Sequence, residues 1–133
     1  MARSDTLPIF LSTYRLLVEI YKVTATFPRE AKFSLGQDMK HDAMDLLRYI
    51  FKANHHTDKR TDLENFLGCF EMLQLQIRLA RELNVLSVRR LAHLALMMDD
   101  ISKQARAWKK YAFKKAVQLE QEALKNGQGG EES

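Results

Sequence analysis

Apolar residues recur at steps of three or four positions through most of this chain, and this spacing constrains the fold more than any other feature. Side chains at such steps share one face of an α-helix, whereas a half-buried strand alternates at every second residue. The sequence contains no alternating stretch of that kind. Its 133 residues include only two prolines and five glycines, and three of the glycines lie close to the C-terminus. The pattern therefore predicts an all-α protein.

Short breaks divide the chain into four expected helices. Pro8 suits the first turn of a helix, and Pro28 ends that helix. Ser34 with Gln37, and Thr61 with Glu64, match the capping-box pattern, in which two side chains satisfy the first free amides of a helix. The expected helices cover residues 8–26, 34–53, 61–83 and 88–125.

The connections between these helices are short. Asn84 can adopt the left-handed conformation that ends a helix, and Ser87 can cap the helix that follows. Helices of similar length joined by short loops favour an antiparallel up-down four-helix bundle, formed here by a single domain of residues 1–125. Residues 126–133 are small, polar and acidic, so we expect them to be a disordered tail.

Two of the expected helices, 8–26 and 61–83, are apolar on two sides. A helix with two apolar sides is buried on both, and one burial is the core of the bundle. We expect the other side to contact a second copy of the chain in a homo-oligomer. The alternative is one broad core stripe with scattered surface leucines. The expected interface residues are Leu16, Ile20, Val23, Leu75 and Leu79.

The last expected helix carries two opposed stripes. Its apolar stripe runs from Ile101 through Trp108 to Leu119, and a row of cations lies on the other side. The formal net charge is +4, and the pI is near 9.3. A cationic helix face on a basic protein is typical of docking onto a polyanion such as nucleic acid, although a solvated surface has the same pattern.

Two arginines stand out near the end of the third expected helix. Arg81 falls in the same sector as Phe70 and Ile77, where a charge is costly unless it is paired. The Arg81 side chain either extends to the surface at the end of the bundle, or bonds a neighbouring carboxylate, or forms part of a cationic site with Arg78. Nucleic-acid or partner contacts are expected at Arg78, Arg81, Lys103, Arg106, Lys110, Lys114, Arg15, Lys22 and Arg48.

No set of residues in the sequence indicates catalysis or a cofactor. The four histidines form no zinc pattern, so we expect no metal and no cofactor. Cys69 is the only cysteine and is expected to be a small core residue. The sequence has no signal peptide and no apolar run long enough to span a membrane, so we expect a cytoplasmic protein that does not bind membranes. Because no set of residues indicates catalysis, we also expect that the protein is not an enzyme.

Several stretches, in this order and spacing, are similar to those of a known family. They are Ile20–Lys22 followed by Phe27–Glu30, Phe33–Gln37, Arg78–Leu83 followed by Leu86–Ser87, and the late Trp108. From Leu7 to Trp108 the chain resembles the Avd family, the accessory variability proteins of diversity-generating retroelements. More loosely, it resembles the four-helix-bundle proteins encoded in intervening sequences of ribosomal RNA genes.

The resemblance to Avd implies a homopentamer of four-helix bundles that forms a barrel with a basic surface. It also implies binding to the reverse transcriptase of the retroelement and to its template RNA or cDNA, with the chemistry supplied by the polymerase. Arg78 and Arg81 match family arginines, which implies a partner-binding role for both. The alternative resemblance implies a stand-alone structural or interaction protein with no polymerase partner.

The chain departs from the family in two places. Residues 37–42 are less basic than in relatives, which weakens the expectation of nucleic-acid binding at that point. The chain also continues past Trp108 with the basic segment Lys109–Lys115. This basic segment either supplies the positive charge that residues 37–42 lack, or binds a partner unrelated to a reverse transcriptase.

Overall fold

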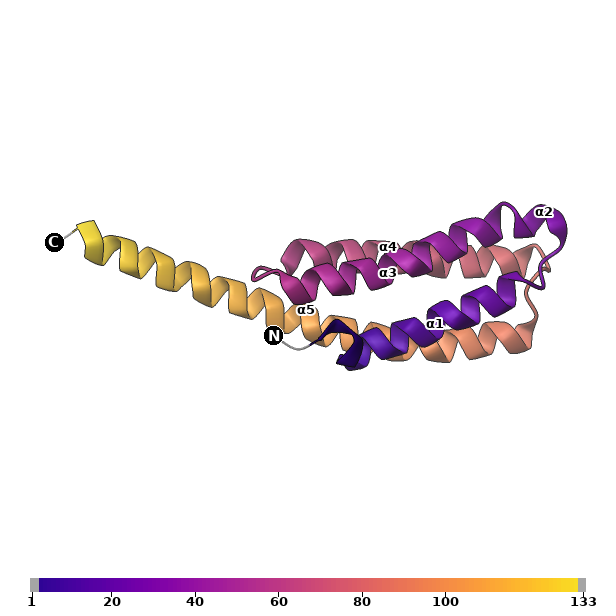
Figure 1. Ribbon diagram of the computed structural model, residues 1–133, viewed down its shortest axis with the longest axis horizontal. Coiled ribbons are helices and arrows are strands. Elements are labelled where there is room, and N and C mark those ends of the chain that lie inside the picture. Colours follow the sequence, from indigo (N-terminus) through magenta and orange to yellow (C-terminus); the bar gives the residue numbers. More distant parts are fainter. Residues whose placement is uncertain (1–2, 132–133) are drawn as a thin grey trace.

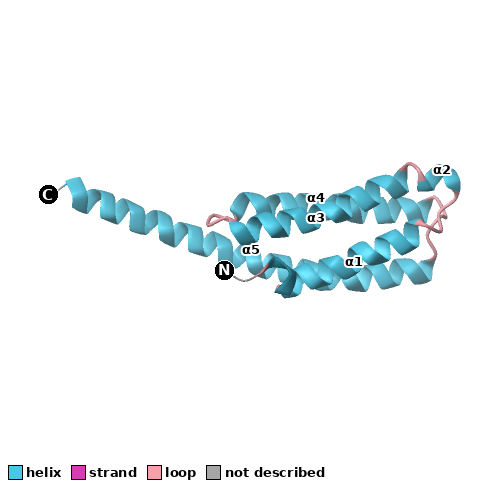
Figure 2. Cartoon of the chain, in the orientation of Figure 1, coloured by secondary structure: helices cyan, strands magenta, loops and turns pink. Residues whose placement is uncertain are grey.

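The computed structural model describes residues 3–131, and every regular element in that part of the chain is helical (Figure 2). The sequence-based expectation of an all-α fold is therefore confirmed. The elements are η1 (Ser4–Thr6), α1 (Pro8–Thr24), α2 (Arg29–Lys32), α3 (Leu35–His55), α4 (Arg60–Glu82) and α5 (Val88–Glu131). Of these, η1 and α2 are short turns beside four long helices.

The four long helices run alternately up and down (Figure 1). Helices α1 and α4 each pack against both α3 and α5, so they occupy opposite corners of the bundle. This is the expected antiparallel four-helix bundle. The interior is apolar, and burying each large aliphatic or aromatic side chain contributes about 1.5–3 kcal/mol. The largest fully buried side chains include Leu16, Met39, Leu46, Phe66, Leu73, Leu94 and Ile101.

The structure corrects the expected interface on α1. Leu16 and Ile20 are 0% exposed and Val23 is 2% exposed, so all three belong to the core of this chain and leave no surface for a second copy. The tyrosines of the other apolar side point outwards, with Tyr14 51% and Tyr21 48% exposed. A tyrosine hydroxyl needs a polar partner or water, whereas aliphatic side chains fill the core without that requirement.

The helix starts also differ from expectation. Ser34 Oγ donates a hydrogen bond to the carbonyl oxygen of Glu30 at 2.7 Å, and its side chain does not cap α3. Helix α4 begins at Arg60, whose backbone amide donates to Asp58 Oδ1 at 3.1 Å, so Thr61 does not cap that helix. Both predicted capping boxes are therefore wrong, because neighbouring turns supply other partners.

The predicted turn between α4 and α5 is confirmed. Asn84 has a φ of 60°, the left-handed conformation, and the backbone amide of Arg90 donates to Ser87 Oγ at 3.2 Å. Asparagine tolerates this backbone region better than most residues. The turn brings the end of α4 next to the start of α5, and so determines which cations meet there.

Helix α5 is longer than expected and extends well beyond the bundle (Figure 1). It continues to Glu131, so residues 126–131 are helical where we expected disorder; the last two residues of the expected tail lie outside the described part. Its 44 residues span about 66 Å, against 17 residues in α1 and 23 in α4. In the part of the chain that the structure describes, no helix is both long and apolar enough to cross a membrane.

Candidate nucleic-acid interface

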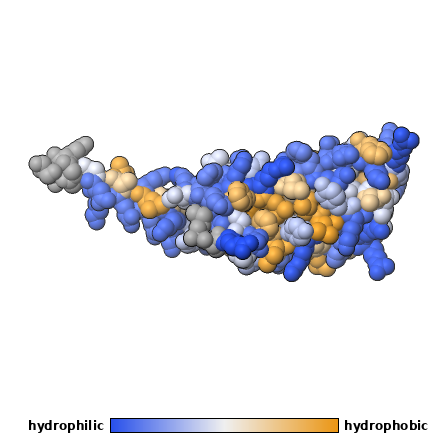
Figure 3. Space-filling model, in the orientation of Figure 1, coloured by the Kyte–Doolittle hydropathy of each residue, from blue (hydrophilic) through white to orange (hydrophobic). Residues whose placement is uncertain are grey.

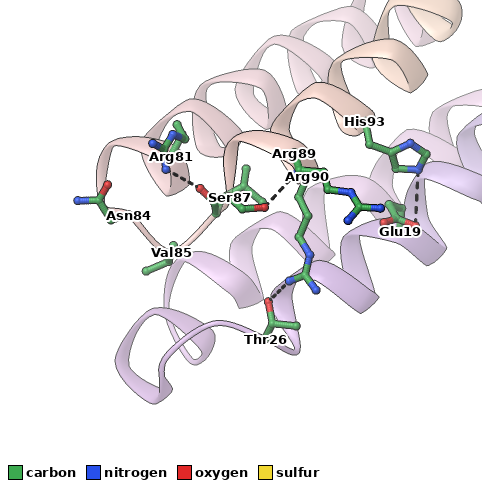
Figure 4. Close-up of a pocket in the computed structure, with 10 residues that line it drawn as sticks. Glu19, Thr26, Arg81, Asn84, Val85, Ser87, Arg89, Arg90 and His93 are labelled. Atoms are coloured by element: carbon green, nitrogen blue, oxygen red, sulfur yellow. Dashed lines mark hydrogen bonds and ion pairs between the residues drawn. The ribbon is translucent and has the colours of Figure 1, made fainter.

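A hollowed track runs along the side of the bundle between α4 and α5. It starts in an end cleft of about 900 Å³, formed where the α4–α5 turn faces α1 (Figure 4). A middle groove of about 480 Å³ and a lower groove of about 490 Å³ follow along the two helices. Arg81 lines both the end cleft and the middle groove, and Arg106 lines both the middle and the lower groove. The two grooves lie between α4 and α5, whereas the end cleft lies on the α1 side of the start of α5 and shares only Arg81 with the middle groove; we call the three cavities together the α4–α5 track.

The track has an apolar floor and cationic edges. In the middle groove the floor includes Ile77, Leu91 and Met98, which belong to the bundle core or pack against it. Four of the cations expected from the sequence line the track: Arg78, Arg81, Arg106 and Lys110. The structure therefore brings together residues from two helices that the sequence could only place on separate faces.

The track carries most of the net charge of the protein. Seven arginine or lysine side chains and four carboxylates line its three cavities, which leaves a formal +3 of the total +4. Opposing the cations are Glu19, Glu71, Glu82 and Asp99. A concave surface with a net positive charge attracts polyanions.

Several of these cations have no carboxylate partner within the described part of the chain. Arg81 Nη1 donates to the carbonyl oxygen of Leu86 at 2.9 Å, and Arg90 Nη1 donates to Thr26 Oγ1 at 2.6 Å, so both guanidiniums are held by neutral oxygens. Neutral acceptors position an arginine without cancelling its charge. The cations at the lower end of the track, Arg106 and Lys110, also form no ion pair among the described residues.

Some cations elsewhere on the surface are paired with carboxylates. Arg48 pairs with Asp45 at 2.5 Å, and Lys103 pairs with Asp99 at 3.0 Å. Arg78 lies on the track but has Glu82 as its partner at 3.4 Å. Such exposed pairs contribute little to stability, but they reduce the charge available to a ligand.

The other cations predicted to bind lie away from the track. Arg15 and Lys22 are exposed on α1, and Arg48 lines a separate hollow with Tyr21 and Lys40 between α1 and α3. Lys114 is exposed on α5, one turn after Lys110. The structure therefore divides the nine predicted cations into four on the track and five elsewhere.

The sequence prediction missed several residues of the track. Arg89, Arg90 and His93 line the end cleft, and Lys109 lines the lower groove. A signal for the two arginines was present, because Arg89 and Arg90 lie in the first turn of α5. Cations are unfavourable at a helix N-terminus, where the helix dipole is positive, so their presence there calls for another role.

The lower groove also offers an aromatic surface. Phe113 lines it with a partly exposed ring, and Lys109 Nζ lies 5.5 Å from the centroid of that ring; Phe70 also lines it but is only 3% exposed and belongs to the core. Aromatic rings beside cations are typical of surfaces that bind single-stranded nucleic acid, since every base has a face that stacks.

Cys69 and the His41 cluster have little reactive character. Burial raises the pKa of the Cys69 thiol to about 12, and its Sγ donates to the carbonyl oxygen of Asp42 at 3.3 Å. His41, Asp42 and Asp45 bring potential ligand atoms within 4.8 Å of one another, but the side chain of Arg48 already pairs with Asp45. An exposed carboxylate held by an arginine gives no specific indication of a metal site.

Comparison with known proteins identifies a family for the chain. A family model described as bAvd-like matches residues 9–112, which include most of the bundle and nearly all of the track. No curated protein matches the chain. The part of α5 beyond residue 112 lies outside the matched region. The chain belongs to the bAvd-like family, a family of non-catalytic accessory proteins.

Proposed function

We propose that this protein is an accessory subunit of a retroelement reverse transcriptase and binds template RNA or cDNA along the α4–α5 track. The observation that carries the proposal is the unneutralised positive charge of the track, with Arg81 and Arg106 linking its three cavities. Family membership supports the association with a reverse transcriptase. In this proposal the polymerase performs all the chemistry, and the accessory protein binds and positions the nucleic acid.

Binding along the track is expected to be independent of sequence. Arginine and lysine contacts to phosphates contribute affinity and orientation, but they do not distinguish bases. From Leu91 to Phe113 the two grooves follow α5 for about 33 Å, a length suited to an extended strand. Its aromatic end at Phe113 offers a stacking surface to any base.

We further propose that the chain assembles into a ring. Two exposed apolar rows lie on opposite corners of the bundle: the α1 stripe (Leu11, Tyr14, Val18 and Tyr21) and the α4 stripe (Met72, Leu75, Leu79 and Leu83). Figure 3 shows an apolar patch over α1 in the face that it presents.

The positions of the two stripes favour head-to-tail assembly. The α1 stripe of one copy meets the α4 stripe of the next, and such an interface closes into a ring when the rotation permits. Leu75 and Leu79, expected at an interface from the sequence, are 56% and 42% exposed and belong to the α4 stripe. We propose a pentamer, as the Avd resemblance implies, and five copies would carry a formal charge of about +20.

A salt titration with a fluorescein-labelled single-stranded RNA tests the nucleic-acid interface. The variant Arg106→Glu with Lys110→Glu should bind at least about tenfold more weakly, and its salt dependence should be shallower because fewer counterions are released. The matched control is Arg15→Glu with Lys22→Glu, which makes the same charge change on α1, away from the track. An equal loss in both variants would show that only net charge matters and would remove the track from the proposal.

A second variant tests whether the nucleic-acid interface continues along α5 beyond the track. Lys110→Glu with Lys114→Glu reverses one cation of the track and one beyond it. A weaker and less salt-dependent interaction, in a protein with an unchanged circular dichroism spectrum, is expected if the strand follows α5. Unchanged RNA binding would show that this end of the track does not contribute.

Purification of the tagged protein from its native host tests the partners. Recovery of a reverse transcriptase with its template RNA at moderate salt is the expected result. Recovery of neither, from a well-expressed oligomer, would favour the stand-alone interaction protein instead. The gene neighbourhood gives an independent check, since a reverse transcriptase gene with a template and variable repeat pair supports the accessory role.

A further inference from the structure

The end cleft differs from the middle groove in its carboxylates, because each is lined by three arginines but the cleft has only Glu19 where the groove has Glu82 and Asp99. Arg81 comes from the last turn of α4, and Arg89 and Arg90 come from the first turn of α5. Figure 4 shows Arg89 and Arg90 extending from α5 towards Glu19 and Thr26 of α1. Three arginines therefore line one cavity of about 900 Å³, which is large enough to admit part of a nucleotide.

Two of these guanidiniums are held in place before any ligand binds. Arg90 donates to the hydroxyl of Thr26, and Arg81 donates to the backbone carbonyl of Leu86. Arg89 has no partner within the described part of the chain. Each guanidinium has five N–H donors, so Arg81 and Arg90 keep donors for a ligand after making these bonds. Preorganised cations lower the entropic cost of binding an anion.

The charge of the end cleft matches a doubly charged anion. Three guanidiniums and the carboxylate of Glu19 give a formal charge of +2. His93 Nε2 lies 4.0 Å from Glu19 Oε2. A phosphomonoester carries about −1.5 to −2 at neutral pH, whereas each internal phosphate of a strand carries −1. Guanidiniums also match the oxygens of a phosphate in geometry, through paired N–H donors.

We propose that the end cleft holds the terminal phosphomonoester of the strand that lies along the α4–α5 track. The inference rests on the proposed nucleic-acid function, and it adds a preference for a phosphorylated strand end. Arg89 and Arg90 bind the terminal phosphate, and Arg81, shared with the middle groove, contacts the next phosphate along the strand. Arg81 is shared by the cleft and the middle groove, so a strand that leaves the groove at the α4–α5 turn passes around the start of α5 and ends against Arg89 and Arg90 on its α1 side.

Fluorescence anisotropy with two otherwise identical single-stranded RNAs tests this assignment. Both carry a 3′ fluorescein, and one has a 5′ phosphate where the other has a 5′ hydroxyl. The wild-type protein should bind the phosphorylated RNA about tenfold more tightly, the size of effect given by hydrogen bonds to a charged group. The variant Arg89→Gln with Arg90→Gln should bind both RNAs equally. Both positions are exposed, and circular dichroism checks that the fold is retained.

Matched controls separate the cleft from net charge. Arg15→Gln with Lys22→Gln removes the same two charges from α1 and should keep the tenfold preference while binding both RNAs slightly more weakly. The proposal is overturned if the wild-type protein does not distinguish the RNAs, or if the preference persists in the Arg89→Gln with Arg90→Gln variant.

Adenosine monophosphate distinguishes a strand end from a free nucleotide. It carries the same phosphomonoester without the rest of the strand, so in calorimetry it should bind the wild-type protein far more weakly than the phosphorylated RNA. Equal affinities would show that the cleft takes a free nucleotide, and would overturn the assignment to a strand end. If neither RNA binds the wild-type protein, the proposed function fails. In that case, loss of adenosine monophosphate binding in the Arg89→Gln with Arg90→Gln variant would still support a phosphomonoester site.

Discussion

Two side chains near the middle of the chain show how burial changes the chemistry of a single residue. Lys59 Nζ donates to the carbonyl oxygens of Ala53 and His56 at 2.6 and 2.7 Å, which satisfies the C-terminal end of α3. Burial lowers the pKa of Lys59, because the charged ammonium loses water. Burial also raises the pKa of Cys69 to about 12, because the thiolate would be the charged form.

The raised pKa of Cys69 predicts slow alkylation of the folded protein. At pH 8 only a very small fraction of this thiol is the reactive thiolate, whereas an unfolded chain has the ordinary pKa, near 9. Iodoacetamide should therefore modify the native protein at least about tenfold more slowly than the protein in urea, as followed by mass spectrometry. The native rate should keep rising with pH beyond 9, up to about 12. Equal rates in both states would show that the thiol is accessible and that its pKa is not raised.

At the scale of the element, α5 has two parts with different surroundings. Within the bundle its inward face is buried, and Ala112 packs with Ala53 and Leu63 in a small cluster covered by Trp108. Beyond Ala116, each side chain from Val117 to Gly127 is exposed. Arg60 Nη2 pairs with Glu120 Oε1 at 2.7 Å and ties the start of the extension to α4. The stability of the bundle should therefore depend on the first part of α5 only.

Two truncations test this division of α5. Ending the chain after Gln121 keeps the Arg60–Glu120 pair and should leave the melting temperature within about 2 °C of the full-length value. Ending it after Ala107 removes Trp108 and Ala112 and should lower the melting temperature by about 10 °C or more, because buried apolar contacts are lost. Circular dichroism melts at one protein concentration give both values. A large drop with the first truncation would show that the extension packs against another surface, such as a second copy.

Two apolar stripes lie on opposite corners of the whole molecule. Their positions determine whether copies of the chain can associate through a twofold interface or through a head-to-tail interface. A twofold interface pairs a surface with itself, whereas a head-to-tail interface pairs two different surfaces. The α1 and α4 stripes are each exposed, and helices α1 and α4 are separated by α3 and α5. Exposed apolar rows of this length favour contacts with other proteins.

Mixing two variants distinguishes the two kinds of assembly. Val18→Asp disrupts the α1 stripe and Leu79→Asp disrupts the α4 stripe. In a head-to-tail ring each variant alone should be monomeric, and an equimolar mixture should form a heterodimer through its one intact interface. If each stripe instead paired with itself, each variant alone would remain a dimer. Light scattering after size-exclusion chromatography measures the masses. The control is Leu96→Asp on α5, a residue that is 73% exposed and outside both stripes.

Local sequence patterns predicted the four long helices and which of their faces are apolar or charged. The spacing of three and four residues, the breaks at Pro28 and Asn84 and the cap at Ser87 act between near neighbours, so they can be predicted without a partner. The cationic side of α5 and the position of Arg81 near the core side of α4 were predicted from the same helical spacing.

Which surfaces and charges meet depends on how the helices pack against one another. Both apolar sides of α1 could have faced the core, and packing against α3 and α5 selected Leu16 over Tyr14. The sequence could not show that Arg81 and Arg89 share one cavity, although the local spacing did predict the pair between Lys103 and Asp99. The physical reason is that burial and electrostatic pairing depend on distances between helices, whereas helix formation depends on contacts a few residues apart.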